Sequence, residues 1–256
     1  MRTLRTIPEV RAALEPARGS SRVGLVPTMG ALHEGHLALL RAAREECEIV
    51  VASLFVNPAQ FGAAFDLDRY PRDETRDAGI FADAGVDLLF APSAEEMYPA
   101  GYQTWIEVTE LGSILEGEFR AGHFRAVATV CCKLFNIVRP DTVYFGQKDA
   151  QQVEVVRRMV RDLDLELELR VIPTVRDENG LALSSRNALL SPDQRRQATA
   201  LARALATRDP AAARRLLNGV EVDYVELAPF EPPVLAAAIR VGGVRLIDNV
   251  VLKGAD

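Results

Sequence analysis

Two histidines, His33 and His36, stand three residues apart with Gly35 between them. Three residues are nearly one helical turn, so the two imidazoles share a face if a helix begins there. The N-terminus of a helix carries unpaired N–H groups and a partial positive charge, and both favour an anion. Gly35 removes a side chain between the histidines and leaves room for a bulky anion. We therefore interpret this segment as a phosphate-binding site.

The same histidines admit two other interpretations, a pair of surface side chains or a pair of metal ligands. A zinc site needs a third and a fourth ligand, and no suitable cluster of ligands follows in the sequence. Two of the three histidines of the chain lie in this one segment. These observations favour a phosphate site over a metal site.

A second polar segment, residues 145–149, also follows a predicted strand. Gly146 permits close approach of a ligand to the backbone, Lys148 offers a cation for phosphate, and Asp149 can accept hydrogen bonds from ribose hydroxyls. An ordinary turn is the alternative interpretation. Gln151 and Gln152 follow on the next helical turn and are further candidate polar ligands.

Two more segments carry polar side chains at comparable places. Ser184, Ser185 and Arg186 combine two hydroxyls with a guanidinium, which binds phosphate oxygens in a fork. The alternative, a loop that caps the following helix, is compatible with phosphate binding. Gln60 follows the second predicted strand and can hydrogen-bond a hydroxyl or a carboxylate, although a simple turn explains this segment as well.

The elements that must position these residues alternate between strands and helices. Apolar strands separated by helices predict a parallel sheet with helices on both faces. We therefore predict an α/β fold, a Rossmann-like doubly wound parallel sheet, over residues 1–174. The expected strands are residues 23–26, 48–56, 86–90, 105–108, 142–145 and 167–171, and the expected helices are residues 34–46, 73–84, 122–138 and 151–162.

Residues 175–256 have a different composition and a different pattern of expected elements. This pattern predicts a small C-terminal α+β lid domain. Residues 191–217 are rich in Ala and Arg and indicate helix, and residues 235–240 indicate a short helix. Strands are expected at residues 222–227 and 244–251. In an open α/β sheet, ligands bind beyond the carboxyl ends of the strands. All four polar segments are expected at that edge, so we predict one shared site.

The bulk composition excludes several classes of protein. The chain has 256 residues, a net charge of −6 and 48% hydrophobic residues. A nucleic-acid partner is disfavoured because no basic footprint is present. No run approaches the ~20 apolar residues of a membrane helix, and the N-terminus does not resemble a signal peptide. Three cysteines do not form a disulfide framework. We expect a cytoplasmic protein with no membrane partner.

Read together, these segments resemble the pantothenate synthetase family. That family belongs to the nucleotidyltransferases with a His-x-Gly-His motif, which are distant relatives of class I aminoacyl-tRNA synthetases. The block of residues 27–36, in combination with residues 184–187, is highly specific. The matching stretches are residues 26–36, 55–62, 68–72, 122–140, 145–152, 180–187 and 240–250.

The resemblance implies an ATP-dependent ligase that works in two steps. Pantoate attacks ATP to give a pantoyl-adenylate and pyrophosphate, and β-alanine then displaces AMP to give pantothenate. A reactive acyl-adenylate must be shielded from water, which makes the C-terminal domain the natural lid. Mg²⁺ is expected to bridge the phosphates. The resemblance also implies a homodimer formed through the N-terminal domain.

Roles carry over to the residues that match the family by position. The expected catalytic residues are His33, His36, Lys148 and Arg186. The expected ATP-binding residues are Met29, His33, His36, Gly146, Lys148, Asp149, Ser184, Ser185 and Arg186. The expected pantoate-binding residues are Met29, Gln60 and Gln152, and Asp77 matches an acidic position that helps to hold the metal.

The chain departs from the family pattern at a few positions. Arg76 stands where an acidic residue is common, which bears on the metal site. Leu183, Gln147 and Asn179 replace a usual methionine, glutamate and aspartate, and the region after Ala198 is shorter than usual. None of these changes removes a catalytic group.

Three rival functions use some of the same residues. Another small-molecule adenylyltransferase would keep His33 and His36 but would not need Gln60 and Gln152 together. A non-catalytic nucleotide-binding protein is disfavoured, because His33, His36, Lys148 and Arg186 are all present. A truncated aminoacyl-tRNA synthetase is disfavoured by the acidic balance of the chain.

Overall fold

A computed structural model describes residues 1–61 and 70–252 of the chain. Three residues of the matching stretches, Gly62, Asp68 and Arg69, lie outside the described residues. The chain divides into two compact units. The first unit comprises residues 1–32, 36–145 and 155–172, and the second comprises residues 33–35, 146–154 and 173–256. The boundary between residues 174 and 175 that we expected for two folding domains stays a prediction.

The first unit is built on a six-stranded sheet, which confirms the predicted α/β fold. The strand order is β1 (Arg2–Leu4), β4 (Leu88–Phe90), β3 (Ile49–Leu54), β2 (Val23–Thr28), β5 (Thr142–Gly146) and β6 (Glu168–Ile172). The pairs β1–β4, β4–β3, β3–β2 and β2–β5 are parallel. The strands at the centre are almost wholly buried because both faces of a doubly wound sheet are covered.

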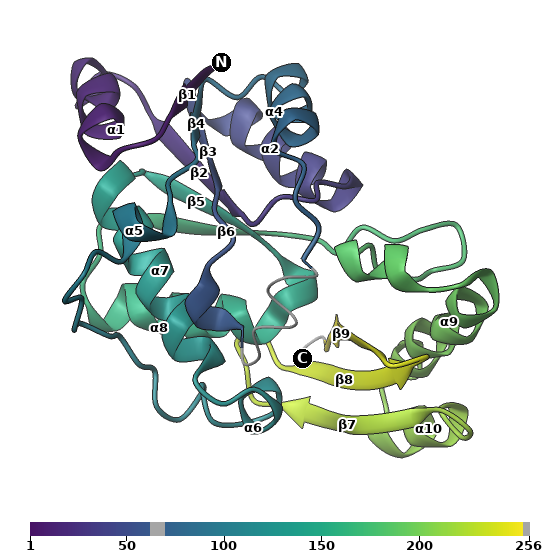
Figure 1. Cartoon of the computed structure of the whole chain (residues 1–256). Helices are drawn as coiled ribbons and strands as arrows, with labels where there is room; N and C mark the ends of the chain where they lie inside the picture. The colour runs from purple at the N-terminus through teal and green to yellow at the C-terminus, as the bar shows by residue number, and fades with distance from the viewer. Residues whose placement is uncertain (62–69, 253–256) are drawn as a thin grey trace. The chain divides into compact units, whose positions relative to one another are not determined.

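Helices cover both faces of this sheet. Figure 1 shows α2 and α4 on one side of the strands and α1 and α7 on the other. Helix α7 is deeply buried, because thirteen of its sixteen residues are buried. The helices are α1 (Ile7–Leu14), α2 (Glu34–Glu46), α4 (Glu74–Asp83), α5 (Ala94–Met97), α6 (Glu116–Phe119), α7 (His123–Val138) and α8 (Ala150–Asp162), with single 3₁₀ turns η1 (Glu15–Ala17), η2 (Pro58–Gln60) and η3 (Gln147–Asp149).

The second unit has a three-stranded antiparallel sheet and a core of its own. Its strand order is β7 (Glu221–Ala228), β8 (Val234–Val241) and β9 (Val244–Val251). Helix α9 (Pro192–Ala206) packs on this sheet, and its Ala198, Leu201 and Leu205 share a core with Ile239 of β8. A further 3₁₀ segment, η4 (Ser185–Leu189), and helix α10 (Pro210–Leu216) complete the unit.

Two predicted elements are wrong. Residues 235–240 form the central strand β8 instead of a helix. Seven of its eight residues are buried, and a short apolar run that is buried on both faces has no period that separates strand from helix. Residues 191–217 are helical as predicted. They form two helices, because Arg208 adopts φ 56° and Pro210 begins α10.

Residues 105–108 form no strand, although they are described throughout. Ile106 donates its N–H to the hydroxyl of Thr129 at 3.0 Å. Trp105, the only tryptophan of the chain, packs against Tyr98 and Tyr102. The side chains of this segment therefore hold it in place without a neighbouring strand.

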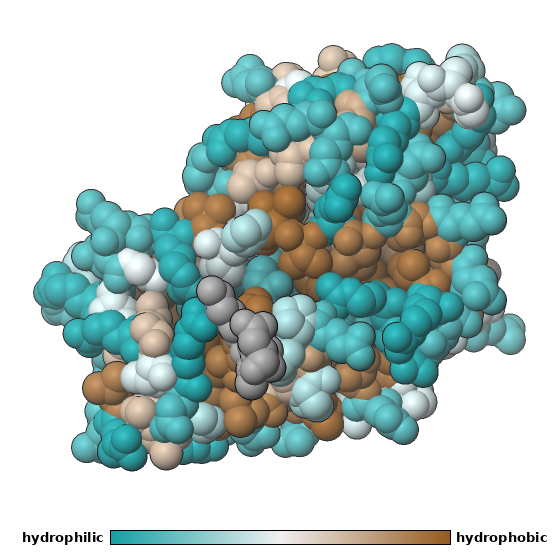
Figure 2. Space-filling model, turned by 180° about the vertical axis from the view of Figure 1, so that it is seen from behind, coloured by the Kyte–Doolittle hydropathy of each residue, from teal (hydrophilic) through white to brown (hydrophobic). Residues whose placement is uncertain are grey.

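Few large hydrophobic side chains are exposed among the described residues. Figure 2 shows one face, on which hydrophilic residues surround patches of hydrophobic ones. All three cysteines, Cys47, Cys131 and Cys132, are free and buried in the first unit. No helix in the described part of the chain is long and apolar enough to cross a membrane.

Candidate active site

The loop that follows β2 is held by a buried aspartate from α4. Asp77 has 1% of its surface exposed. Its Oδ2 accepts the N–H of Ala31 at 2.8 Å, and its Oδ1 accepts the N–H of Leu32 at 3.0 Å. Gly30 has φ +83°, and a Cβ there would lie 2.7 Å from Asp77 Oδ2. Asp77 therefore fixes the backbone that leads into the two histidines, and this contact requires glycine at position 30.

The metal role expected for Asp77 stays a prediction, and the geometry supports a role in the loop. Both of its carboxylate oxygens already accept N–H groups. Arg76, the departure from the family pattern, donates to Leu32 O at 3.1 Å and so holds the same loop. Among residues 1–61 and 70–252, no cluster of three or more His, Cys, Asp or Glu side chains suits a metal ion.

The first unit also brings together two residues that we expected to bind pantoate. The amide nitrogen of Gln60 lies 2.8 Å from the sulfur of Met29. Asn57 donates to the amide oxygen of Gln60 at 3.2 Å. Gln60 is 9% exposed, so its amide is set by neighbours and not by solvent. His36 is half-buried in the same unit, at the start of α2.

His123, which was not among the site residues expected from the sequence, supports Gln60. Its Nδ1 lies 3.1 Å from the carbonyl oxygen of Gln60, and its Nε2 lies 3.0 Å from the guanidinium of Arg120. His123 is 9% exposed. A polar residue at the start of the apolar helix α7 was the available signal. It was overlooked because its partner lies 63 residues away in the sequence.

In the second unit, His33 is arranged as a neutral hydrogen-bond donor. Its Nδ1 accepts the N–H of Gly35 at 3.1 Å, which leaves the proton of a neutral ring on Nε2. Burial lowers the pKa of His33, and the charge of Lys148 lowers this pKa further, while Asp149 acts in the opposite direction. The Nε2–H group can donate to a phosphate oxygen at neutral pH.

Gly35 makes this arrangement of His33 possible. A Cβ at position 35 would lie 2.9 Å from Cε1 and 3.0 Å from Nδ1 of the His33 ring. The glycine therefore makes room for the imidazole itself, whereas we had expected it to make room for an anion.

The turn after β5 places a cation in the same unit. Nζ of Lys148 lies 3.4 Å from Oδ1 of Asp149, and the Lys148 side chain is 16% exposed. Nothing lies within 4 Å of a Cβ built on Gly146, so open space is present where we expected a ligand to approach. Gln152 is half-buried in the first turn of α8.

The loop before α9 combines capping with an exposed guanidinium. Oγ of Ser184 accepts the N–H of Arg186 at 3.3 Å and caps η4, whereas the longer helix α9 has Ser191 as its N-cap. Ser185 is half-buried and Arg186 is exposed. Asn187 donates to the carbonyl of Ala182 at 3.0 Å and stabilises the loop from inside.

The chain as a whole has clear counterparts among known proteins. The family model described as Pantoate-beta-alanine ligase matches residues 2–251. The chain belongs to this family. A pantothenate synthetase from Moorella thermoacetica is 50% identical over 283 aligned positions, which cover 100% of both chains. Because 283 exceeds 256, that ligase carries segments that this chain lacks. Their placement after Ala198 stays a prediction.

Solved structures agree with the family assignment. The pantothenate synthetase of Thermus thermophilus superimposes with a TM-score of 0.92 at 46% identity and covers 98% of this chain and 99% of its own. The pantoate–β-alanine ligase of Francisella tularensis, solved in complex with beta-gamma ATP and β-alanine, has a TM-score of 0.89 at 35% identity. The matches cover 98% of this chain and 97% of the Francisella chain.

Proposed function

We propose that this ligase condenses pantoate with β-alanine and releases AMP and pyrophosphate. The arrangement of His33 as a neutral donor in the same unit as Lys148 carries the proposal. A phosphate needs such donors and cations, and phosphoryl transfer asks a protein mainly for positioning and charge stabilisation. Family membership supplies the identity of the two substrates.

The reaction balances in two displacements. A pantoate carboxylate oxygen attacks the α-phosphorus of ATP, the bond to the bridging oxygen breaks, and pyrophosphate leaves. The β-alanine amine then attacks the pantoyl carbonyl, loses a proton, and expels AMP. Excluding water protects the adenylate between the steps, and we assign this task to the C-terminal residues 175–256 as a lid.

Each expected residue has a task in this scheme. His33, His36 and Lys148 hold the ATP phosphates and stabilise developing charge. Ser184, Ser185 and Arg186 hold the outgoing phosphates, Gly146 and Asp149 hold the ribose, Met29 contacts both ligands, and Gln60 and Gln152 orient pantoate. The hydrogen bond from Gln60 to Met29 and the contact of His123 with Gln60 hold the Gln60 side chain in place. A fixed side-chain amide suits the role of orienting pantoate.

Mg²⁺ fits this scheme as a companion of ATP. Mg²⁺ keeps several waters and binds through substrate phosphates with one or two carboxylates at most. The described residues supply no dedicated cluster of ligands, in keeping with an ion held largely by the nucleotide. Bound there, the ion would neutralise charge on the phosphates.

We also propose a cytoplasmic homodimer that associates through the first unit. Two large side chains of that unit, Trp105 and Phe119, are 42% and 44% exposed. Light scattering should give a mass of about 56 kDa, twice 28.0 kDa. A mass of 28.0 kDa at micromolar concentration would contradict the dimer.

Product analysis tests the chemistry directly. With ATP, Mg²⁺, pantoate and β-alanine, the protein should release AMP and pyrophosphate in equal amounts. Without β-alanine, pantoate alone should support exchange of labelled pyrophosphate into ATP. Release of ADP would contradict the adenylate, and release of pyrophosphate without AMP would indicate an adenylyltransferase.

Lys148→Ala tests the assignment of the phosphate site. Loss of one charge-stabilising donor should lower kcat by about 10²- to 10³-fold. Lys133→Ala is the matched control, since Lys133 lies 4.9 Å from the centre of the Tyr102 ring and has no assigned task. Equal rates for the two variants would remove Lys148 from the mechanism.

A further inference from the structure

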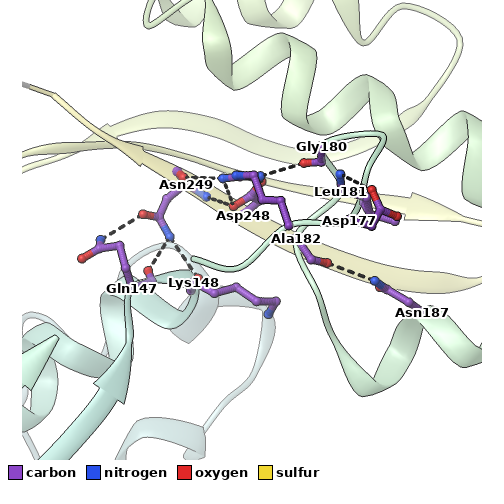
Figure 3. Close-up of polar contacts among 10 residues, drawn as sticks. Gln147, Lys148, Asp177, Gly180, Leu181, Ala182, Asn187, Asp248 and Asn249 are labelled. Atoms are coloured by element: carbon purple, nitrogen blue, oxygen red, sulfur yellow. Dashed lines mark hydrogen bonds and ion pairs between the residues drawn. The ribbon is translucent and has the colours of Figure 1, made fainter. Parts of the chain in front are cut away.

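Two buried polar residues, Asp248 and Asn249, stand side by side near the end of β9. They are 3% and 4% exposed, and the mechanism above gives neither a task. Burying a polar side chain costs free energy unless it is hydrogen-bonded. Figure 3 shows that Asn249 faces Gln147 and Lys148 and that Asp248 lies beside the loop of Gly180 and Ala182. The partner of Asp248 is Arg176.

The amide of Asn249 is fully used by the turn after β5. Its Nδ2 donates to the carbonyl oxygens of Gln147 at 2.9 Å and of Lys148 at 3.0 Å. Its Oδ1 accepts the side-chain amide of Gln147 at 3.0 Å. Two donors and one acceptor are thus committed to η3, the turn that carries Lys148.

These bonds also set the direction of the neighbouring N–H groups. In a planar trans peptide, the C=O and N–H bonds point in opposite directions. Because the carbonyls of Gln147 and Lys148 face Asn249, the N–H groups of Lys148 and Asp149 point away from it. Donors that point in one direction, beside a lysine, suit an anion.

Asp248 connects the same strand to the loop that carries Ser184. Its two oxygens accept the Arg176 guanidinium at 2.6 and 3.0 Å, a bidentate pair. Arg176 also donates to the carbonyl of Gly180 at 3.0 Å. Arg176 forms an isolated antiparallel bridge with Ala182, two residues before Ser184. The loop is therefore tied to β9 through one arginine.

We propose that Asp248 and Asn249 are positioning residues for ATP. Asn249 orients the turn of Lys148, and Asp248 orients the Ser184–Arg186 loop through Arg176. Two adjacent residues of β9 thereby fix the positions of two phosphate-binding segments. This inference rests on the proposed function, because it assumes that Lys148 binds ATP.

A double-variant cycle tests the role of Asn249. Asn249→Ala should raise KM for ATP and lower kcat/KM for ATP on the order of 10- to 100-fold, with KM for β-alanine unchanged. In a Lys148→Ala background, Asn249→Ala should cost a smaller factor than in the wild type, because the Lys148 side chain that Asn249 positions is gone while the backbone N–H groups of the turn remain. Asn249→Asp keeps the shape but loses both donors, and it should repeat the loss for ATP.

The outcomes separate this inference from the proposed function. If Lys148→Ala has full activity, the role of Lys148 fails and the positioning role fails with it. If Lys148→Ala is impaired and Asn249→Ala costs the same factor in both backgrounds, only the positioning role is overturned. If Asn249→Ala lowers kcat and leaves every KM unchanged, the variant simply contains less folded enzyme. That result would also overturn the inference.

Asp223 provides a matched control for Asp248. Its carboxylate lies in β7 of the same sheet, is 8% exposed, and accepts Arg240 at 2.9 Å and Arg245 at 2.5 Å. Both Asp223→Asn and Asp248→Asn weaken an ion pair of the second unit. Only Asp248→Asn should raise KM for ATP, by about tenfold. Equal KM values for ATP in the two variants would overturn the role of Asp248.

Discussion

The loop after β2 and the turn after β5 are held in the same way but with opposite hydrogen-bond polarity. In the first unit, Asp77 accepts two backbone N–H groups, those of Ala31 and Leu32. In the second unit, Asn249 donates to two backbone carbonyls, those of Gln147 and Lys148. Each holding residue is buried and comes from an element distant in sequence.

The difference determines which groups each backbone presents on its other side. Because C=O and N–H point in opposite directions across a peptide, the loop held by Asp77 directs carbonyls away from Asp77. The turn held by Asn249 directs N–H groups away from Asn249. Of the two backbones, only the second directs N–H donors outward, toward a possible phosphate. At the loop after β2, donors for a phosphate must instead come from side chains, those of His33 and His36.

The largest expected effect is a difference in the free energy of unfolding between variants of the two holding residues, Asp77 and Asn249. Asp77→Ala removes the partner of one buried N–H group, that of Leu32, and of one half-buried N–H group, that of Ala31. It should lower the free energy of unfolding by about 2–6 kcal/mol, at 1–3 kcal/mol each. Asn249→Ala should cost less, since under-satisfied carbonyls are better tolerated than orphaned N–H groups. Urea unfolding followed by circular dichroism compares them, and a larger loss for Asn249→Ala would reverse the comparison.

A smaller effect is expected where Asp77 meets Gly30. Gly30→Ala places a Cβ 2.7 Å from Asp77 Oδ2 at a positive φ, so it should lose about 1–3 kcal/mol from overpacking in addition to the conformational cost. Gly19→Ala is the control, because Gly19 has φ +73° and nothing within 4 Å of a Cβ. That variant should show the conformational cost alone, about 1–2 kcal/mol. Equal losses of unfolding free energy in Gly30→Ala and Gly19→Ala would show that the Asp77 side chain moves aside at little cost.

The smallest effect concerns the titration of His33. The pKa of folded His33 lies below its ordinary value of 6.5, through burial first and Lys148 second. As pH falls, the unfolded chain takes up the proton first, so the stability from neutral His33 is present above pH 6.5 and is lost as pH falls through the folded pKa.

Lys148→Ala should raise the pKa of His33 part of the way back, because burial remains. NMR titration of the imidazole measures this shift, with Lys133→Ala as the control. A shift of the same size in both variants would show that the Lys148 turn does not hold its charge near His33.

The sheet could be predicted from the sequence more fully than the residues that hold the loops. The strands β2, β3 and β5 are buried apolar runs, and their pattern is local. The strand β8 was mistaken for a helix because its three alanines favour helix, whereas burial between β7 and β9 decides its structure. Tertiary packing overrides such a propensity.

The predicted site residues could be named from the sequence, but their supports could not. Asn249 reaches carbonyls 101 and 102 residues away, and Asp77 reaches N–H groups 45 and 46 residues away. No periodicity reports such contacts. The one available signal was a polar pair, Asp248 and Asn249, within the otherwise apolar end of β9.

The uneven placement of Trp105 and the three cysteines determines what spectroscopy can observe. All four lie in the first unit, and the chain has no other tryptophan or cysteine. Indole fluorescence and thiol labelling will therefore report opening of the parallel sheet and will be silent about the β7–β9 sheet. A tryptophan introduced at an exposed site such as Leu227, which is 56% exposed, would give the second unit an optical signal of its own.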